Sequence, residues 1–177
     1  MKNAKFRFCI FELLLFGLLT GGCSRVASVI VYSRIVNVMA SDPICNKSVE
    51  VHLVGVNRFE KDLWETMSMT DYWMPGNQLR KSAKEYTYVI QFGQGPCTKT
   101  LNKKDPIQVI WKKRKAEYLF VLADLPGVYT DGVGNADARR LRLPAADSAH
   151  WGWRKKQIDI RIEESNIVSL TVPAKGD

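Results

Sequence analysis

This 177-residue chain contains two histidines and four cysteines, the residue types that most often bind metals or act in catalysis. His52 stands between Val51 and Leu53 in an alternating stretch, so we expect it on the outward face of a strand. His150 precedes Trp151 in a loop, where it is a weak candidate for a metal ligand or a general base. The sequence contains no GxSxG nucleophile turn and no glycine-rich phosphate loop after a strand. We therefore predict that the protein is not an enzyme.

One acidic loop has the composition of a cation site. The stretch DGVGNAD places side-chain oxygens at Asp131, Asn135 and Asp137, which resembles a calcium loop without its bidentate Glu. The same residue types are favoured in turns for backbone reasons alone. We expect a turn here, with no metal and no cofactor, and a weak calcium site is the alternative.

The N-terminus has the order of a secretory signal. Lys2, Lys5 and Arg7 precede an apolar run over residues 8–19, and the run ends in LLTGGC. About 12 apolar residues at about 1.5 Å each extend over about 18 Å, whereas the hydrocarbon layer is about 30 Å thick. A removable signal is therefore favoured over a transmembrane anchor.

The end of this signal, LLTGGC, resembles the bacterial lipobox. The resemblance implies that residues 1–22 are removed and that Cys23 becomes an acylated first residue. Several acyl chains, each contributing about 0.8 kcal/mol per buried methylene, form a stable anchor. Residues 23–33 are then the acylated cysteine and a linker, and residues 34–177 form a single domain. Ser24 at the second mature position implies the outer membrane, on its periplasmic face.

Two further cysteines remain in the exported domain. Cys45 and Cys97 both follow turn signals, DPIC and GQGPC. A pair in an oxidising compartment favours one disulfide, and two buried free thiols are the alternative.

Most of the domain has the pattern of strands. Period-2 alternation predicts half-buried strands, and the uniformly apolar stretch 118–123 predicts a central strand that is covered on both faces. Seven short strands with turns between them favour a mainly β fold, an antiparallel β-sandwich with one or two short added helices. The strands are expected at 34–40, 48–54, 86–92, 118–123, 139–143, 157–163 and 167–172.

Two helices are expected between the strands. Asp105 is an N-cap followed by Pro106, and the helix that they begin carries an apolar stripe and ends in basic residues 112–115. A second helix is expected over residues 57–66, with a capping box at its start and an apolar side that docks on the sheet. Residues 68–84 then form a long loop outside the sheet, of a kind that is often functional.

Aromatic residues in loops are the candidates for partner binding. Tyr72, Trp73 and Met74 gather before a glycine turn, and Trp151 and Trp153 flank a glycine between strands. Trp and Tyr dominate the energetics of protein interfaces, which favours partner binding. Core packing is the competing explanation for these aromatic residues, and for Trp73 we weigh the two explanations about equally.

Basic residues give the chain a net charge of +8 and cluster at 112–115, 139–142 and 154–156. We interpret them mainly as solvated faces, with acidic partner surfaces or bilayer phosphates as counterparts. Nucleic acid is not an expected partner for an exported lipoprotein.

The order of these features resembles the outer-membrane lipoprotein of type VI secretion systems (TssJ-type). The similarity is carried by the lipobox, by EYLFVLADLPG at 117–127, by RRLRLP at 139–144, by Trp151 and by QIDIRIEESNIVSLTV at 157–172. The resemblance implies a transthyretin-like sandwich that binds the periplasmic C-terminal domain of a large inner-membrane subunit (TssM-type). Such a protein tethers a trans-envelope complex to the outer membrane. A periplasmic lipoprotein that binds glycan or peptidoglycan is the alternative.

Overall fold

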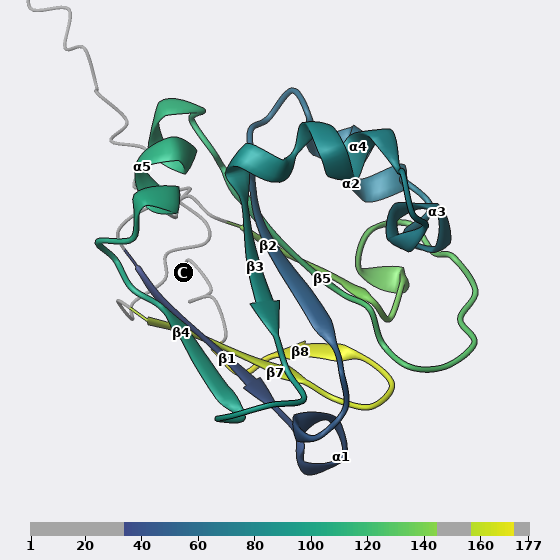
Figure 1. The fold of residues 1–177 in the computed structure, drawn as a ribbon. Helices are drawn as coiled ribbons and strands as arrows, with labels where there is room; N and C mark the ends of the chain where they lie inside the picture. Colours follow the sequence, from purple (N-terminus) through teal and green to yellow (C-terminus); the bar gives the residue numbers. More distant parts are fainter. Residues whose placement is uncertain (1–33, 145–156, 172–177) are drawn as a thin grey trace, which may run out of the picture.

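Two four-stranded sheets stacked face to face form the body of the protein (Figure 1). The structure is a computed structural model, and it describes residues 34–144 and 157–171. In chain order the elements are β1 (Ile35–Ala40), α1 (Asp42–Cys45), β2 (Glu50–Val56), α2 (Lys61–Thr66), α3 (Met69–Trp73), α4 (Gln78–Ser82), η1 (Lys84–Tyr86), β3 (Thr87–Gln91), β4 (Thr98–Leu101), α5 (Pro106–Lys113), β5 (Tyr118–Ala123), η2 (Gly134–Ala136), β6 (Arg140–Pro144), β7 (Gln157–Ile162) and β8 (Ile167–Ser169).

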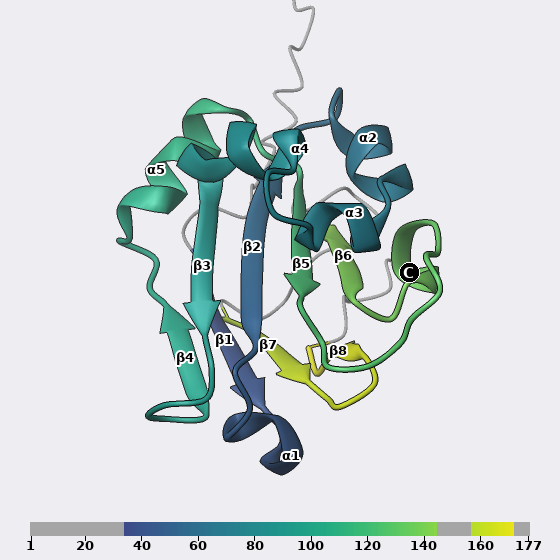
Figure 2. The same cartoon turned by 45° about the vertical axis from the view of Figure 1, so that its right-hand side comes forward.

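The strand order shows a sandwich, as the sequence predicts. One sheet has the order β4-β1-β7-β8 and the other the order β3-β2-β5-β6 (Figure 2). All pairs are antiparallel except β1 and β7, which run parallel with Ile35 opposite Gln157. The apolar sides of both sheets meet in one core, which includes Val36, Leu53 and Ile160. The fold class is therefore confirmed, with two differences in detail. β1 and β7 form a parallel pair, which strand periodicity does not specify. β4 is a strand at residues 98–101, where the sequence analysis expected none.

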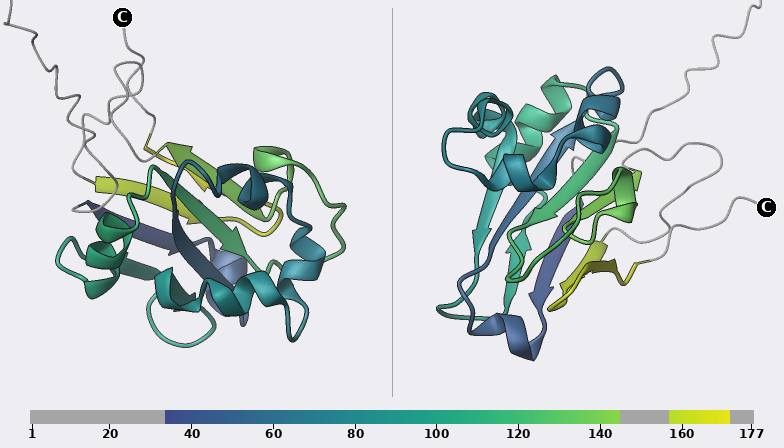
Figure 3. Two further views of the ribbon diagram at one scale, coloured as in Figure 1. Left: turned by 90° about the horizontal axis from the view of Figure 1, so that it is seen from above. Right: turned by 90° about the vertical axis from the view of Figure 1, so that its right-hand side faces the viewer.

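A layer of short helices covers the outer face of the β3-β2-β5-β6 sheet. The right-hand view of Figure 3 shows helices on one side of this sheet and the second sheet on the other. The layer consists of α2, α3, α4 and η1, and it occupies residues 61–86. The expectation of a long loop over residues 68–84 was therefore wrong. Two caps that the sequence reading overlooked start these helices: the Ser68 hydroxyl accepts from Asp71 N, and the Asn77 side chain accepts from Arg80 N.

Because the helices cover this face, polar strand residues expected in water are buried. His52 is buried in β2, contrary to the expectation of an outward-facing residue. Arg140 in β6 is also buried, contrary to the expectation of a solvated face. The alternation itself is correct, since Leu143 and its neighbours on the other face enter the core. The predicted exposure of these residues was wrong because helices, and not solvent, cover the outer face of the sheet.

Helix α5 closes one end of the sandwich and agrees with the sequence prediction. The Asp105 side chain accepts a hydrogen bond from Ile107 N, and Pro106 follows as the first helical residue. Trp111 is fully buried, and its indole Nε1 donates to the Tyr86 carbonyl oxygen at 2.8 Å. The other expected helix starts later than predicted, at Lys61.

That later start has a local cause at residues 57–60. The Asn57 side chain accepts from Phe59 N and Glu60 N, so it caps a turn that precedes α2. The Glu60 carboxylate does not complete a capping box. It accepts two hydrogen bonds from the Arg114 guanidinium, at 2.7 and 2.8 Å. Of the two residues expected to dock this helix, Trp64 is buried and Leu63 is exposed.

Gly55 in β2 allows α5 to approach the sheet, and this yields a first prediction. A Cβ at position 55 would lie 2.5 Å from the Trp111 ring, which is fixed by its hydrogen bond. Overpacking of this kind costs about 1–3 kcal/mol. Gly55→Ala is therefore expected to lower the free energy of unfolding by about 2 kcal/mol in a denaturant titration. The control repeats Gly55→Ala in a Trp111→Ala background, where the ring that the new Cβ meets is absent and the substitution should cost much less. An equal loss in both backgrounds would contradict this account of Gly55.

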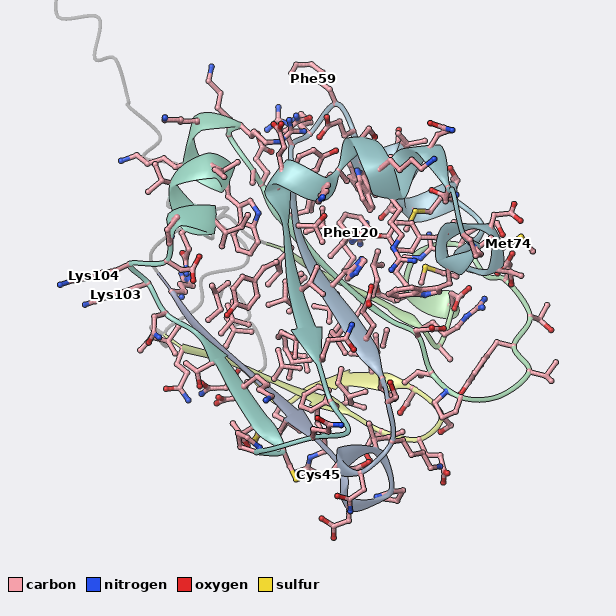
Figure 4. All side chains as sticks on the ribbon, viewed as in Figure 1. Cys45, Phe59, Met74, Lys103, Lys104 and Phe120 are labelled. Carbon is pink, nitrogen blue, oxygen red and sulfur yellow. A yellow bond between two sulfur atoms is a disulfide. The ribbon has the colours of Figure 1, made fainter. Side chains whose placement is uncertain are left out.

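A disulfide joins Cys45 to Cys97 at the end of the sandwich opposite α5 (Figure 4 labels Cys45). Both cysteines lie on connections that cross from one sheet to the other, and their Cα atoms are 5.1 Å apart. The pairing agrees with the favoured interpretation of the sequence. Within residues 34–144 and 157–171, no helix has the length and apolar content that crossing a bilayer requires.

Candidate functional site

The residues predicted to act fall into two groups in the structure. Cys23, Trp151, Trp153 and His150 lie outside the described residues. Their roles stay predictions. The remaining candidates, Tyr72, Trp73 and Met74, lie at the end of α3 and directly after it.

These three neighbours differ strongly in exposure. Tyr72 is 1% exposed, and its ring packs edge-on against Trp64 in the core. Trp73 is partly buried, with the Arg80 guanidinium 5.1 Å from its ring centroid. Met74 is 53% exposed and extends from the helical layer (Figure 4). Tyr72 therefore supports this surface from beneath, whereas Met74 and the open side of Trp73 face solvent.

A polar cluster fixes α3 and α4 to the sheet. The Tyr72 hydroxyl lies 2.7 Å from His52 Nδ1, and Glu50 Oε1 lies 2.6 Å from His52 Nε2. The same Glu50 carboxylate accepts hydrogen bonds from Arg80 in α4 and from Gln91 in β3. Both nitrogens of His52 are thus occupied by neighbours, so the ring positions the helices and offers no free nitrogen to a substrate.

Charge and burial act on this cluster in opposite directions. Burial lowers the pKa of His52, and the adjacent Glu50 carboxylate only partly offsets this effect. Burial alone would raise the pKa of Glu50. The hydrogen bond to His52 and the positive charge of Arg80 outweigh burial and bring that pKa below its usual value.

A shallow hollow opens beside the cluster. It encloses about 320 Å³ and is lined by His52, Gly76, Asn77, Arg80, Lys81, Lys84, Thr87 and Val89. Its rim is cationic, and Arg80, which lines it, also lies over the Trp73 ring. We name the exposed surface of Trp73, Met74, Arg80 and Lys81 the α3–α4 patch.

A second network occupies the loop that resembles a calcium site. The Asp131 carboxylate accepts hydrogen bonds from Ser68, Thr70 and Arg139, the last at 2.5 Å. Asp137 accepts from Gly132 N and from the Arg139 guanidinium. Arg139 thus supplies the positive charge that a cation would bring, and among the described residues there is no cluster of three metal-binding side chains.

The network also connects the loop to the helical layer through a residue that sequence reasoning did not identify. Arg140 donates to the carbonyl oxygens of Trp64, Glu65 and Met67, at the end of α2, and to that of Gly132 in the loop. The only sequence signal was an arginine on the outer face of a strand, which is the pattern of a solvated position.

The carboxylates of Asp131 and Asp137 make the stability of the fold sensitive to acid. Burial raises the pKa of Asp131 and of Asp137, but the hydrogen bonds from Arg139 and its neighbours outweigh burial and lower both below the usual value. An acid with a depressed pKa stabilises the fold above its unfolded pKa of about 4, and this stability is lost as the pH falls. His52 acts in the same sense, because its unfolded form takes up a proton near pH 6.5 before the folded form does. Asp124, whose pKa is raised by burial and by Glu50, acts in the opposite sense.

The free energy of unfolding is therefore expected to fall as the pH is lowered from 7 to 3. Denaturant titrations at several pH values measure this slope. Asp131→Asn is expected to reduce stability at pH 7 and to flatten the slope below about pH 4, since it removes one of the depressed carboxyls. A variant with the wild-type slope would show that Asp131 does not carry the effect.

Comparisons with known proteins gave matches among solved structures. No protein-family model matches the sequence, and no curated protein matches it. Among solved structures, a "Type VI membrane complex" chain is similar with a TM-score of 0.49 and 12% identity, over 77% of this chain and 96% of that chain.

Two further solved structures are similar in the same way. Lip of Serratia marcescens, described as a membrane-bound component of the type VI secretion system, has a TM-score of 0.45 and 11% identity, over 77% of this chain and 94% of its own. The type VI lipoprotein TssJ1 of Pseudomonas aeruginosa has a TM-score of 0.44 and 9% identity, over 79% of this chain and 95% of its own. Each is a likeness of backbone architecture at low identity, and by itself it assigns no partner and no activity to this chain.

Proposed function

We propose that this chain is an outer-membrane lipoprotein that tethers a trans-envelope, type VI secretion complex through the periplasmic domain of a TssM-type inner-membrane subunit. The observation that carries the proposal is the order of the parts. A lipobox-like Cys23 precedes β1 by a short linker, and a sandwich closed by a disulfide follows. A tether requires a lipid, a linker and a stiff platform, and it requires no catalysis.

The stiffness of the platform has a physical basis in the described residues. The two sheets share one core, and the Cys45–Cys97 disulfide closes the far end. The helical layer is bound to its sheet by hydrogen bonds of His52 with Tyr72, Glu50 with Arg80, and Arg140 with the carbonyl oxygen of Trp64. The sequence motifs 117–127 and 139–144 that resemble the TssJ-type family form β5 and β6 with the turns beside them.

Acylation is tested by metabolic labelling with a palmitate analogue. The wild-type protein is expected to incorporate the label and to fractionate with the outer membrane, and Cys23→Ser is expected to do neither. Partner identity is tested by pull-down from a cross-linked envelope. Recovery of a large inner-membrane subunit supports the tether, whereas retention on cell-wall polymer alone favours the glycan-binding alternative.

The α3–α4 patch is the surface that we assign to the partner. Met74 combines exposure with an apolar side chain, and Arg80 lies across the Trp73 ring beside it. Tryptophan, arginine and large apolar side chains with polar surroundings are the composition of interface hot spots. Burial of Met74 and Trp73 by a partner would also cover part of the cationic hollow, which favours a partner surface with carboxylates.

Met74→Asp is expected to lower recovery of the partner about tenfold, because it places an unpaired charge in an apolar contact. Quantitative pull-down from the cross-linked envelope measures this. Leu170→Asp is the matched control, since Leu170 is a similarly exposed apolar residue directly after β8, the edge strand of the other sheet. Equal recovery with both variants would remove the patch from the interface.

A further inference from the structure

The end of the sandwich that α5 closes is also the end at which the described chain begins. The Gln108 side chain of α5 donates to the Arg34 carbonyl oxygen at 2.7 Å. In the neighbouring strand, Val36 pairs with Leu101, so the turn that follows β4 lies beside the start of β1. The chain therefore enters the domain directly against α5.

The solvent side of this end is basic. Residues 98–115 contain seven Lys and Arg against one acid, Asp105, whose side chain caps α5. We name Lys103, Lys104, Val109, Lys113 and Lys115 the α5 face. All five are exposed, and Figure 4 shows Lys103 and Lys104 extending outward beside the start of β1.

The lysines of the α5 face have no ion-pair partner among the described residues, in contrast to the neighbouring Arg114, which is paired with Glu60. Val109 and Lys113 stand one helical turn apart and therefore share a side of α5. The face thus presents an exposed apolar side chain, 53% accessible, among unpaired cations. This is the composition of a surface that lies on lipid headgroups.

Local structure accounts for only one of these lysines. Cations at the C-terminal end of a helix complement its dipole, which explains Lys113. Lys103 and Lys104, however, precede the N-terminal end of α5, where the dipole disfavours positive charge. Lys115 has a φ of 56°, a left-handed conformation at the helix end for which glycine is the favoured residue. Lysine is therefore present at three positions where local stability favours other residues, because of charge at Lys103 and Lys104 and because of backbone conformation at Lys115.

We infer that the α5 face rests on the anionic phospholipid headgroups of the leaflet that holds the acyl chains of Cys23. The inference rests on the proposed function, because it takes Cys23 as the lipid anchor. Residues 23–33 span at most about 40 Å when fully extended, which limits the distance between the anchor and the start of the domain. Electrostatic attraction by this face then orients the domain. Met74 lies on the side of the molecule away from Lys103 and Lys104, so the α3–α4 patch is directed away from the membrane (Figure 4).

The test uses the unacylated chain from Ser24 onward, which retains every residue of the described core. It is mixed with vesicles of phosphatidylethanolamine containing phosphatidylglycerol, and separately with neutral phosphatidylcholine vesicles, and binding is measured by co-sedimentation. Binding to the anionic vesicles is expected to exceed binding to the neutral vesicles and to weaken as salt is added.

Two paired substitutions make the test specific. Lys104→Gln with Lys113→Gln is expected to weaken binding to anionic vesicles about 25-fold, at about fivefold for each lysine near a charged surface. Lys47→Gln with Arg161→Gln makes the same change in charge away from the α5 face and is expected to leave binding within about twofold. Equal binding to both kinds of vesicle, or equal losses in both variants, would overturn the inference.

These outcomes are independent of the acylation test because the chain used lacks Cys23. A protein that binds anionic vesicles through the α5 face but never incorporates palmitate would contradict the proposed function and still support contact between the α5 face and anionic lipid. A protein that is acylated but shows no preference for anionic vesicles would support the proposed function and contradict this inference.

Discussion

Replacing Arg140 by methionine is expected to lower the free energy of unfolding by about 3–5 kcal/mol. The Arg140 side chain is fully buried, and it donates to four carbonyl oxygens, on α2, on the residue after it and in the loop before η2. Methionine retains much of the apolar stem but leaves those oxygens without a donor. A buried acceptor that loses its partner costs about 1–3 kcal/mol, and a few such losses together give the expected range.

The matched control for Arg140→Met is Arg161→Met. Arg161 lies on β7 with its side chain half exposed, and it forms an ion pair with Glu163 at 3.7 Å. Surface changes of this kind are usually within about 0.5 kcal/mol. Denaturant titration gives both free energies, and amide hydrogen exchange locates the loss, which should be largest over α2 and residues 131–137. If Arg140→Met were no worse than the control, the carbonyl contacts would contribute little to stability.

Arg140 also marks the limit of what periodicity can predict. Alternation in RRLRLP correctly assigned one face to the core and the other face outward, and 118–123 was correctly predicted as a central strand with the bounds seen for β5. Alternation reports which residues share a face. It does not report whether water or a helix lies over that face, and in this protein three short helices and a 3₁₀ turn do.

Those helices were missed because they are brief. Five-residue helices such as α3 and α4 complete little more than one turn, so no apolar stripe repeats within them. Their caps at Ser68 and Asn77 were visible in the sequence and could have been used. By contrast, α5 has eight residues, a capping aspartate and a proline, and it was predicted correctly.

Some residues of the candidate site were predicted, but their burial was not. The cluster of Tyr72, Trp73 and Met74 was recognised from residue type, but residue type does not distinguish a buried ring from an exposed one. The burial of Tyr72 follows from its contact with His52, a residue 20 positions earlier on another element. Such long-range contacts depend on how α3 folds over β2, and single-sequence patterns contain no information on that.

Reduction of the Cys45–Cys97 disulfide is expected to lower the free energy of unfolding by about 4 kcal/mol. The cysteines are 52 residues apart, and a cross-link that closes a loop of this length removes chain entropy worth about 4 kcal/mol from the unfolded state. Local hydrogen bonds hold the same connections together: Gly93 N donates to the Cys45 carbonyl, and Ala40 N donates to the Cys97 carbonyl. The native geometry at this end is therefore supported without the cross-link, so the loss should come mainly from the unfolded chain.

The measurement compares denaturation midpoints with and without a thiol reductant for the wild type and for Cys45→Ala with Cys97→Ala. The wild type should lose stability on reduction, and the double variant should already have the lower stability and be insensitive to reductant. If reductant left the wild-type midpoint unchanged, the two sulfurs would be free thiols in the protein. Since domains of this size have about 5–15 kcal/mol of stability in total, a loss of about 4 kcal/mol outside an oxidising compartment would remove between about a quarter and most of it. The disulfide thus connects the stability of the sandwich to the exported location that the tethering proposal requires.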